Sequence, residues 1–155
     1  MTQTANPTAT APTGIPLDDF LCFAIYSANL AFGRAYRPIL EAHGLTYTQY
    51  VALVALWEQD DQTVGALGEK LFLESNTLTP ILKKLEQSGF VERRRDPADE
   101  RQVRIRLTAK GSALRGECFG EQLIEATGLG ADFAAVQQAI ARLRDNLLTA
   151  TAAKG

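Results

Sequence analysis

The sequence is poor in the side chains that hold metals or cross-link chains. Its 155 residues include only two cysteines and one histidine. Two thiols and one imidazole cannot complete a closed structural zinc site within one chain, so neither a metal nor another cofactor is expected. Long apolar runs are also missing, since the longest, residues 51–57, has seven residues. That is far too short to span a bilayer, and no transmembrane helix is predicted.

Lysine and arginine are absent from the first sixteen residues, which are rich in Thr, Ala and Pro. This segment lacks the charged start and the apolar centre of a signal peptide. We expect a disordered tail over residues 1–16, one domain over residues 17–150, and a cytoplasmic protein. A reducing cytoplasm keeps thiols free, so any disulfide would be a regulated event.

Positive charge is concentrated in one stretch of an acidic chain. The net charge is −2, but residues 83–106 hold eight basic and five acidic side chains, a local charge of +3. A basic stripe on an acidic body indicates a DNA contact more than general polyanion binding. The alternative is a solvated charged hairpin.

Apolar residues at three- and four-residue spacing predict a long first helix that reaches about Ala42. Asp18 or Asp19 is the expected cap, and Pro38 should bend or interrupt the helix. A second, mostly apolar helix should run to about Glu58. Its start carries a capping-box pattern, with Thr46 three residues before a glutamine.

The next segments follow the order of a helix-turn-helix with a wing. After a turn at residues 60–63, a short helix is predicted over 64–71 and another, capped by Ser75, through Gln87. Two short helices joined by a tight turn are typical of a helix-turn-helix. Residues 90–95 and 102–107 flank a turn-forming segment, and apolar and polar residues alternate in the second, which predicts a β-hairpin.

The remaining chain is predicted to be helical. Thr108 should cap a helix to about Thr127, residues 128–130 should break it, and a final amphipathic helix should cover residues 131 to about 150. The fold class is therefore mainly α with a small β wing. His43, just before a glycine, is expected to cap a helix or face water.

The helix that starts at Ser75 is the expected reader of DNA, since base edges in the major groove are reached from the N-terminal half of a recognition helix. The expected contacts from this helix are Ser75, Asn76, Thr77, Thr79, Pro80, Lys83 and Lys84. Arginines of the hairpin suit the minor groove, and these are Arg93, Arg94, Arg95, Arg101 and Arg104. Asp99 is expected to orient the guanidinium of Arg101.

Four segments together resemble the core signature of MarR-family regulators: 78–86 (LTPILKKLE), 89–91 (GFV), 96–103 (DPADERQV) and 107–111 (LTAKG). The resemblance implies a winged-helix DNA-binding lobe over about residues 46–110. It also implies a homodimer formed by helices at about 18–42 and 108–150, and a pseudo-palindromic double-stranded operator.

The first and last helices carry apolar residues that would otherwise face water, and burial between two subunits would stabilise them. A core contained within one chain is the alternative. The residues concerned are Phe20, Phe23, Ile25, Phe133, Val136, Ile140, Leu143 and Leu147.

Residues 21–29 (LCFAIYSAN), 36–37 and 45–50 (LTYTQY) resemble one branch, the organic hydroperoxide resistance regulators (OhrR). The resemblance implies a repressor that leaves DNA when organic hydroperoxides oxidise Cys22. It also implies that Tyr36 and Tyr47 hydrogen-bond the thiolate and that Tyr26 belongs to the same pocket. No enzymatic activity is expected.

Helix geometry limits which thiolate Tyr36 can reach. It follows Cys22 by fourteen residues, about 21 Å along a helix at 1.5 Å per residue, so it must serve the Cys22 of a partner subunit. The helix N-terminus favours a thiolate at Cys22, although Asp18 opposes this. Oxidation would give a sulfenic acid that condenses with another thiol, either Cys118 or a small cellular thiol.

Other interpretations stay open at this stage. In the alternative interpretation, Cys22 is a small buried hydrophobic residue and Cys118 is an inert helix residue. If both cysteines are incidental, the protein would be a MarR-type repressor released by a small aromatic or phenolic ligand. A thiol peroxidase that turns over peroxide at Cys22 is the alternative from another class.

Overall fold

The computed structural model describes residues 14–117 and 119–153, so residues 1–13 of the expected tail and Cys118 lie outside the described residues. The chain divides into two compact units, Met1–Arg34 and Ala35–Gly155. Among the described residues, no helix is both long and apolar enough to cross a membrane.

A short 3-10 turn, η1 (Leu17–Asp19), precedes the long helix α1 (Leu21–Glu41). The expected cap of α1 was wrong. The carbonyl of Phe20 accepts the Ala24 amide at 3.0 Å, so Phe20 holds the cap position, while the Asp19 amide is used in the 3-10 turn. Pro38 does not interrupt α1, because it lies in the last turn and removes only one backbone donor there.

Helix α2 (Tyr47–Glu58) begins with the predicted capping box. The Gln49 amide donates to the Thr46 hydroxyl at 3.3 Å, and the Thr46 amide donates to the Gln49 side chain at 2.8 Å. Its buried residues Ala52, Leu53 and Leu56 face the core of the second unit. The capping box therefore sets where this central helix starts.

The predicted helix-turn-helix is confirmed as α3 (Val64–Leu71) followed by α4 (Ser75–Gln87). Its buried side chains are largely leucines: Leu67, Leu78, Leu82 and Leu85 have no exposed surface. Ser75 was wrongly expected to be the cap. It is the first helical residue, and Glu74 takes the cap position without a side-chain bond.

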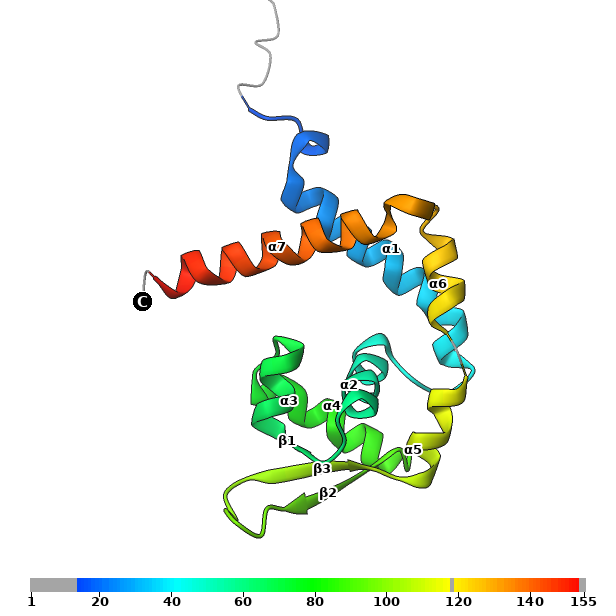
Figure 1. The fold of residues 1–155 in the computed structure, drawn as a ribbon, viewed down its shortest axis with the longest axis vertical. Helices are drawn as coiled ribbons and strands as arrows, with labels where there is room; N and C mark the ends of the chain where they lie inside the picture. Colours follow the sequence, from blue (N-terminus) through cyan, green and yellow to red (C-terminus); the bar gives the residue numbers. More distant parts are fainter. Residues whose placement is uncertain (1–13, 118, 154–155) are drawn as a thin grey trace, which may run out of the picture. The chain divides into compact units, whose positions relative to one another are not determined.

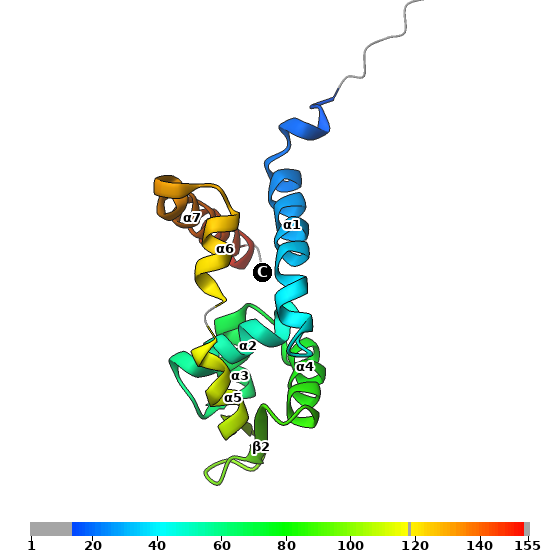
Figure 2. The ribbon, with the colours of Figure 1, turned by 90° about the vertical axis from the view of Figure 1, so that its right-hand side faces the viewer.

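The wing is an antiparallel hairpin of β2 (Val91–Arg95) and β3 (Val103–Leu107), in which Val91 pairs with Leu107. A two-residue strand, β1 (Gln62–Thr63), pairs with the other edge of β3, so the sheet order is β1-β3-β2. Only a turn had been predicted at β1, since two residues are too few to show a period. The hairpin extends past α2, α3 and α4 in both views (Figures 1 and 2).

The segment after the wing is less regular than predicted. Thr108 caps α5 (Ala109–Ala113), but η2 (Leu114–Gly116) follows before α6 (Gly120–Ala126). The prediction of a single helix to Thr127 was therefore wrong. Gly116 and Gly120 lie on either side of the interruption, and glycine weakens a helix.

The last helix follows two glycines with left-handed φ angles, Gly128 at 65° and Gly130 at 52°. The short turn η3 (Gly130–Asp132) leads into α7 (Phe133–Ala152). Several large apolar side chains of α7 are exposed, with Ile140 at 49% and Leu147 at 58%. Exposed apolar patches of this kind mark surfaces that pack against another protein surface.

Candidate DNA interface and thiol site

The first turns of α4 present the small polar residues expected at DNA. Ser75, Asn76, Thr77 and Pro80 are exposed, and Thr79 is half-buried. The Thr79 hydroxyl donates to the Ser75 carbonyl at 2.6 Å. Because Leu78 and Leu82 anchor the opposite side in the core, this polar face is held outward.

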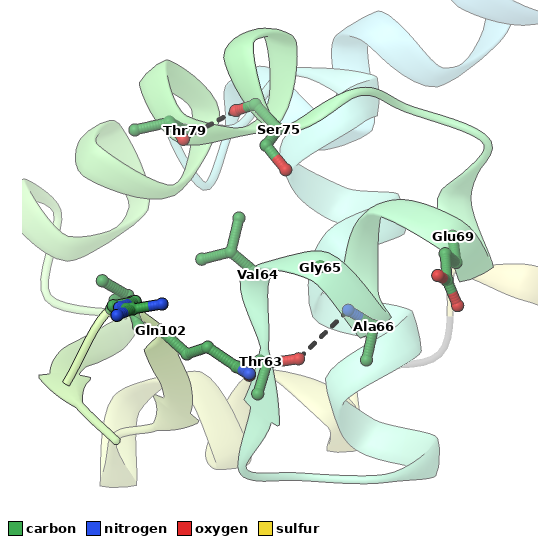
Figure 3. Close-up of a pocket in the computed structure, with 10 residues that line it drawn as sticks. Thr63, Val64, Gly65, Ala66, Glu69, Ser75, Thr79 and Gln102 are labelled. Carbon is green, nitrogen blue, oxygen red and sulfur yellow. Dashed lines mark hydrogen bonds between the residues drawn. The ribbon is translucent and has the colours of Figure 1, made fainter. Parts of the chain in front are cut away.

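An open hollow of about 620 Å³ lies beside that face (Figure 3). It is formed by three elements: the start of α3, the start of α4, and the end of the wing turn with the start of β3. Its lining residues are Thr63, Val64, Gly65, Ala66, Glu69, Ser75, Thr79, Arg101, Gln102 and Val103. The contribution of α3 was not predicted from the sequence, although Thr63 is a recognisable cap whose hydroxyl accepts the Ala66 amide at 3.1 Å.

The tip of the wing is built by carboxylates that bond backbone amides. Asp96 accepts the Ala98 amide at 2.8 Å, and Asp99 accepts the Arg101 amide at 3.1 Å. Asp99 also accepts the side-chain amide of Gln102 at 3.3 Å. Among the described residues no ion pair joins Asp99 to Arg101, so the expectation that Asp99 orients this guanidinium stays a prediction. Asp99 shapes the turn.

The half-buried Arg104 forms ion pairs with two carboxylates of the lobe. Its guanidinium bonds Asp61 through the side chain at 2.9 Å and through the backbone carbonyl, and it bonds Asp96 at 3.1 Å. The Ala98 amide and then Arg104 hold the pKa of Asp96 below its usual range, and Asp61 followed by Asp96 raises the pKa of Arg104. Arg104 thus braces the wing against the turn before β1.

A second ion pair joins the recognition helix to the wing. Arg93 donates to Glu86 from its side chain at 2.8 Å and from its backbone at 3.3 Å. The side-chain bond from Arg93 is the main cause of the lowered pKa of Glu86. The pair fixes β2 relative to the end of α4.

The other basic side chains lie at the surface, and some of them have no partner carboxylate among the described residues. Arg94 pairs with Glu92 at 2.6 Å, an exposed contact, and Arg95 donates to the Glu100 carbonyl at 3.3 Å. Lys83, Lys84 and Arg101 are exposed, and no carboxylate within the described parts of the chain pairs with them. Exposed cations suit phosphate contacts.

The residues expected to form the thiol pocket fall in different units. Cys22 is exposed at the second residue of α1 and is a free thiol. Tyr26, in the same unit, is exposed and contacts Phe23 with ring centroids 6.3 Å apart. Cys118 lies outside the described residues.

Tyr36 and Tyr47 lie together in the second unit, with ring centroids 5.0 Å apart. Burial, and then the nearby Tyr47 and Tyr50, raise the pKa of the Tyr36 phenol. A phenol with a raised pKa keeps its proton at neutral pH and remains a hydrogen-bond donor. The end of α1 and the start of α2 therefore bring the rings of Tyr36 and Tyr47 into contact.

His43 neither caps a helix nor faces water, contrary to expectation. Its Nε2 lies 3.1 Å from a carboxylate oxygen of Glu117, and its ring contacts Phe119 with centroids 5.1 Å apart. Both partners are more than seventy residues away in sequence. The contact joins the end of α1 to the segment after the wing.

These features define a winged helix-turn-helix transcriptional regulator. Residues 34–117, more than half of the chain, match the family described as transcriptional regulator SarA/Rot. The chain belongs to the MarR family, as the sequence signature predicted, and the family model that it matches is the SarA/Rot type.

Two curated relatives are similar over much of the chain. The HTH-type transcriptional regulator TtmR of Methylorubrum extorquens (strain PA1) is 50% identical over 134 residues, 84% of this chain and 69% of the relative. The organic hydroperoxide resistance transcriptional regulator of Bacillus subtilis (strain 168) is 44% identical over 99 residues, 64% of this chain and 67% of the relative. The chain thus spans about two thirds of each relative.

Solved structures of AbfR match more completely. Reduced AbfR bound to DNA has a TM-score of 0.68 and 38% identity, covering 85% of this chain and 95% of that one. Disulfide-formed AbfR has a TM-score of 0.59 and 36% identity, covering 86% of this chain and 92% of that one. The relatives are regulators of transcription, and DNA-bound and oxidised forms occur among these structures.

Proposed function

We propose that this regulator is a homodimeric repressor that senses organic hydroperoxides through Cys22 and then releases a pseudo-palindromic operator. The observation that carries the proposal is the pair of packed phenols, Tyr36 and Tyr47, in a chain whose exposed cysteine lies at a helix start. The names of the Bacillus subtilis relative and of the AbfR structures support a redox signal.

DNA contact is assigned to the polar face of α4 and to the exposed cations around it. Ser75, Asn76 and Thr77 would approach base edges, and Lys83, Lys84, Arg95 and Arg101 would bind phosphates. The DNA-binding lobe in this proposal comprises residues 46–110. Arg93 and Arg104 hold the lobe together in place of the DNA contacts first expected of them, because carboxylates already engage them.

The sensing site is completed by a second subunit. The fourteen residues between Cys22 and Tyr36 correspond to about 21 Å of helix, so the phenols would serve the partner's thiolate. Exposed apolar residues such as Leu21, Ile140 and Leu147 would be covered in such a dimer. Helices 18–42 and 108–150 form its interface in this proposal.

The chemical step is a two-electron oxidation of sulfur. The Cys22 thiolate attacks the terminal oxygen of the hydroperoxide, the O–O bond breaks, and the alkoxide leaves as an alcohol after taking a proton. The product is a sulfenic acid, which condenses with a thiol to give a disulfide and water. That thiol is Cys118 or a small cellular thiol. Loss of the anion removes the acceptor that held Tyr36 and Tyr47.

The test measures operator binding by fluorescence anisotropy before and after cumene hydroperoxide. Wild type should release DNA, whereas Cys22→Ser should bind with unchanged affinity and stay bound. Cys118→Ser is the matched control, and non-reducing gels show whether it prevents a linked dimer. If Cys22→Ser still dissociates with peroxide, the thiol assignment fails. Release of wild type by a phenolic carboxylate alone would instead favour ligand sensing.

A further inference from the structure

Tyr50 lies at the centre of an aromatic cluster that extends well beyond the proposed thiol pocket. Its ring centroid is 6.0 Å from that of Tyr36, 6.0 Å from Trp57 and 5.6 Å from Phe119. The last two contacts have interplanar angles of 72°, the edge-to-face arrangement that aromatic rings favour. Tyr50 therefore connects the phenol pair with the interior of the lobe.

Trp57 continues the chain of contacts to the base of the wing. Its indole N–H donates to the carbonyl of Gly111 in α5 at 2.9 Å. Gly111 in turn lies directly against Phe90, the residue before β2, because an added Cβ would be 2.1 Å from the Phe90 carbonyl oxygen. Trp57 is thus hydrogen-bonded to a backbone that packs against the Phe90 backbone with no side chain between them.

The segment that Gly111 touches joins the recognition helix to the wing. The Phe90 amide donates to the Leu85 carbonyl of α4 at 2.9 Å, and the Thr108 hydroxyl donates to the Gly89 carbonyl at 2.6 Å. Lys110 donates to the Ser88 carbonyl at 2.8 Å. The end of α4, the start of β2 and α5 are therefore one hydrogen-bonded joint.

We propose that Tyr50 and Trp57 are positioning residues that transmit the state of the Tyr36 phenol to this joint, and so set the orientation of the recognition helix and wing. The proposal rests on the proposed function, because the signal at Tyr36 is the oxidation of a thiolate. Tyr36 and Tyr50 move together since their rings are in contact, and Trp57 moves with Tyr50. The change reaches DNA through the joint, not through the phenols themselves.

The test separates transmission from sensing and from DNA binding. Full-length protein is assayed for the rate of Cys22 oxidation, for operator affinity when reduced, and for the ratio of affinities before and after oxidation. Coupling between sites is typically about 5- to 150-fold. We expect Tyr50→Leu and Trp57→Phe to keep the first two quantities within about 3-fold of wild type, with an affinity ratio that falls below about 3.

Tyr50→Phe is the matched control, since it retains the ring and should keep the wild-type ratio. Trp57 is the only tryptophan of the chain, so its emission reports on this contact directly and should change when Cys22 is oxidised. If Tyr50→Leu fails to fold, Trp57→Phe and the emission of wild type still test the proposal.

Three results overturn the inference. Oxidised Tyr50→Leu or Trp57→Phe that leaves DNA as completely as wild type refutes transmission alone. So does an unchanged Trp57 emission in a wild-type protein that releases its operator. A wild type that stays on DNA after Cys22 is oxidised refutes the proposed function, and the transmission with it.

Discussion

The two glycines of α3, Gly65 and Gly68, differ in the space that a side chain would have. The effect of this difference on stability can be measured. A Cβ on Gly65 would have Thr63 Oγ1 as its nearest neighbour, at 4.0 Å. A Cβ on Gly68 would lie 2.6 Å from the carbonyl oxygen of Leu73, where real Cβ atoms do not come within 3.0 Å. The Leu73 oxygen belongs to the turn of the helix-turn-helix, which Phe72 enters with a left-handed φ of 57°.

The same substitution should therefore have different effects at the two positions. Alanine gains up to about 1 kcal/mol over glycine within a helix, and Gly65→Ala should raise the free energy of unfolding by up to that amount. Gly68→Ala has the same gain but an overpacking cost of about 1–3 kcal/mol or more. The difference between the variants isolates the steric cost, and it corresponds to roughly 2–12 °C in Tm for a chain of this size.

The assay is thermal and urea unfolding followed by circular dichroism. Because a dimer's stability depends on concentration, wild type and both variants must be compared at one protein concentration. The expected order of stability is Gly65→Ala above Gly68→Ala. Equal stability of the two variants would refute the close approach between α3 and the turn.

Three other predictions concern the wing. Gly111→Ala should cost about 3 kcal/mol or more, because its Cβ would lie 2.1 Å from the Phe90 carbonyl oxygen; a wild-type urea midpoint would contradict this. Arg104→Met should speed proteolysis of the wing and weaken operator binding while leaving the salt dependence unchanged, whereas loss of a phosphate contact reduces the salt slope by about 1. The lowered pKa of Asp96 stabilises the wing above the ordinary carboxyl pKa, and this is lost as the pH falls through the lowered value. The protection factor of the Ala98 amide, which is the exchange rate corrected for its intrinsic pH dependence, should therefore fall in acid, and a protection factor independent of that protonation would contradict the role of Asp96.

Elements with local signals were predicted correctly from the sequence. The capping box at Thr46, the glycine at position 89 and the alternation of residues 102–107 depend on neighbours within a few positions, and each structure formed as expected. Strand β1 and the break after α5 were missed. Gln62 forms a strand only because Ile105 lies opposite it, so its conformation depends on a partner forty-three residues away.

The site shows the same division. The residues of α4 that face outward follow from helix periodicity. The role of Arg104 could not be predicted in this way, because Asp61 is distant in sequence. The number of arginines does not show which of them form internal ion pairs and which would contact phosphates. Tyr50 was quoted within a motif but given no role, since only the fold reveals that its ring contacts Tyr36 and Trp57.

The internal ion pairs have a consequence for how strongly salt weakens DNA binding. Of the eight basic residues between positions 83 and 106, Arg93, Arg94 and Arg104 already neutralise carboxylates within the described structure. Five basic residues of this segment are then left per subunit to displace counterions, or ten in a symmetric pair. With a slope of about −0.9 per neutralised phosphate, the contacts of this segment should give a slope of log affinity against log salt of about −9. The arginines that pair with carboxylates inside the lobe would therefore add little to the salt dependence of DNA binding.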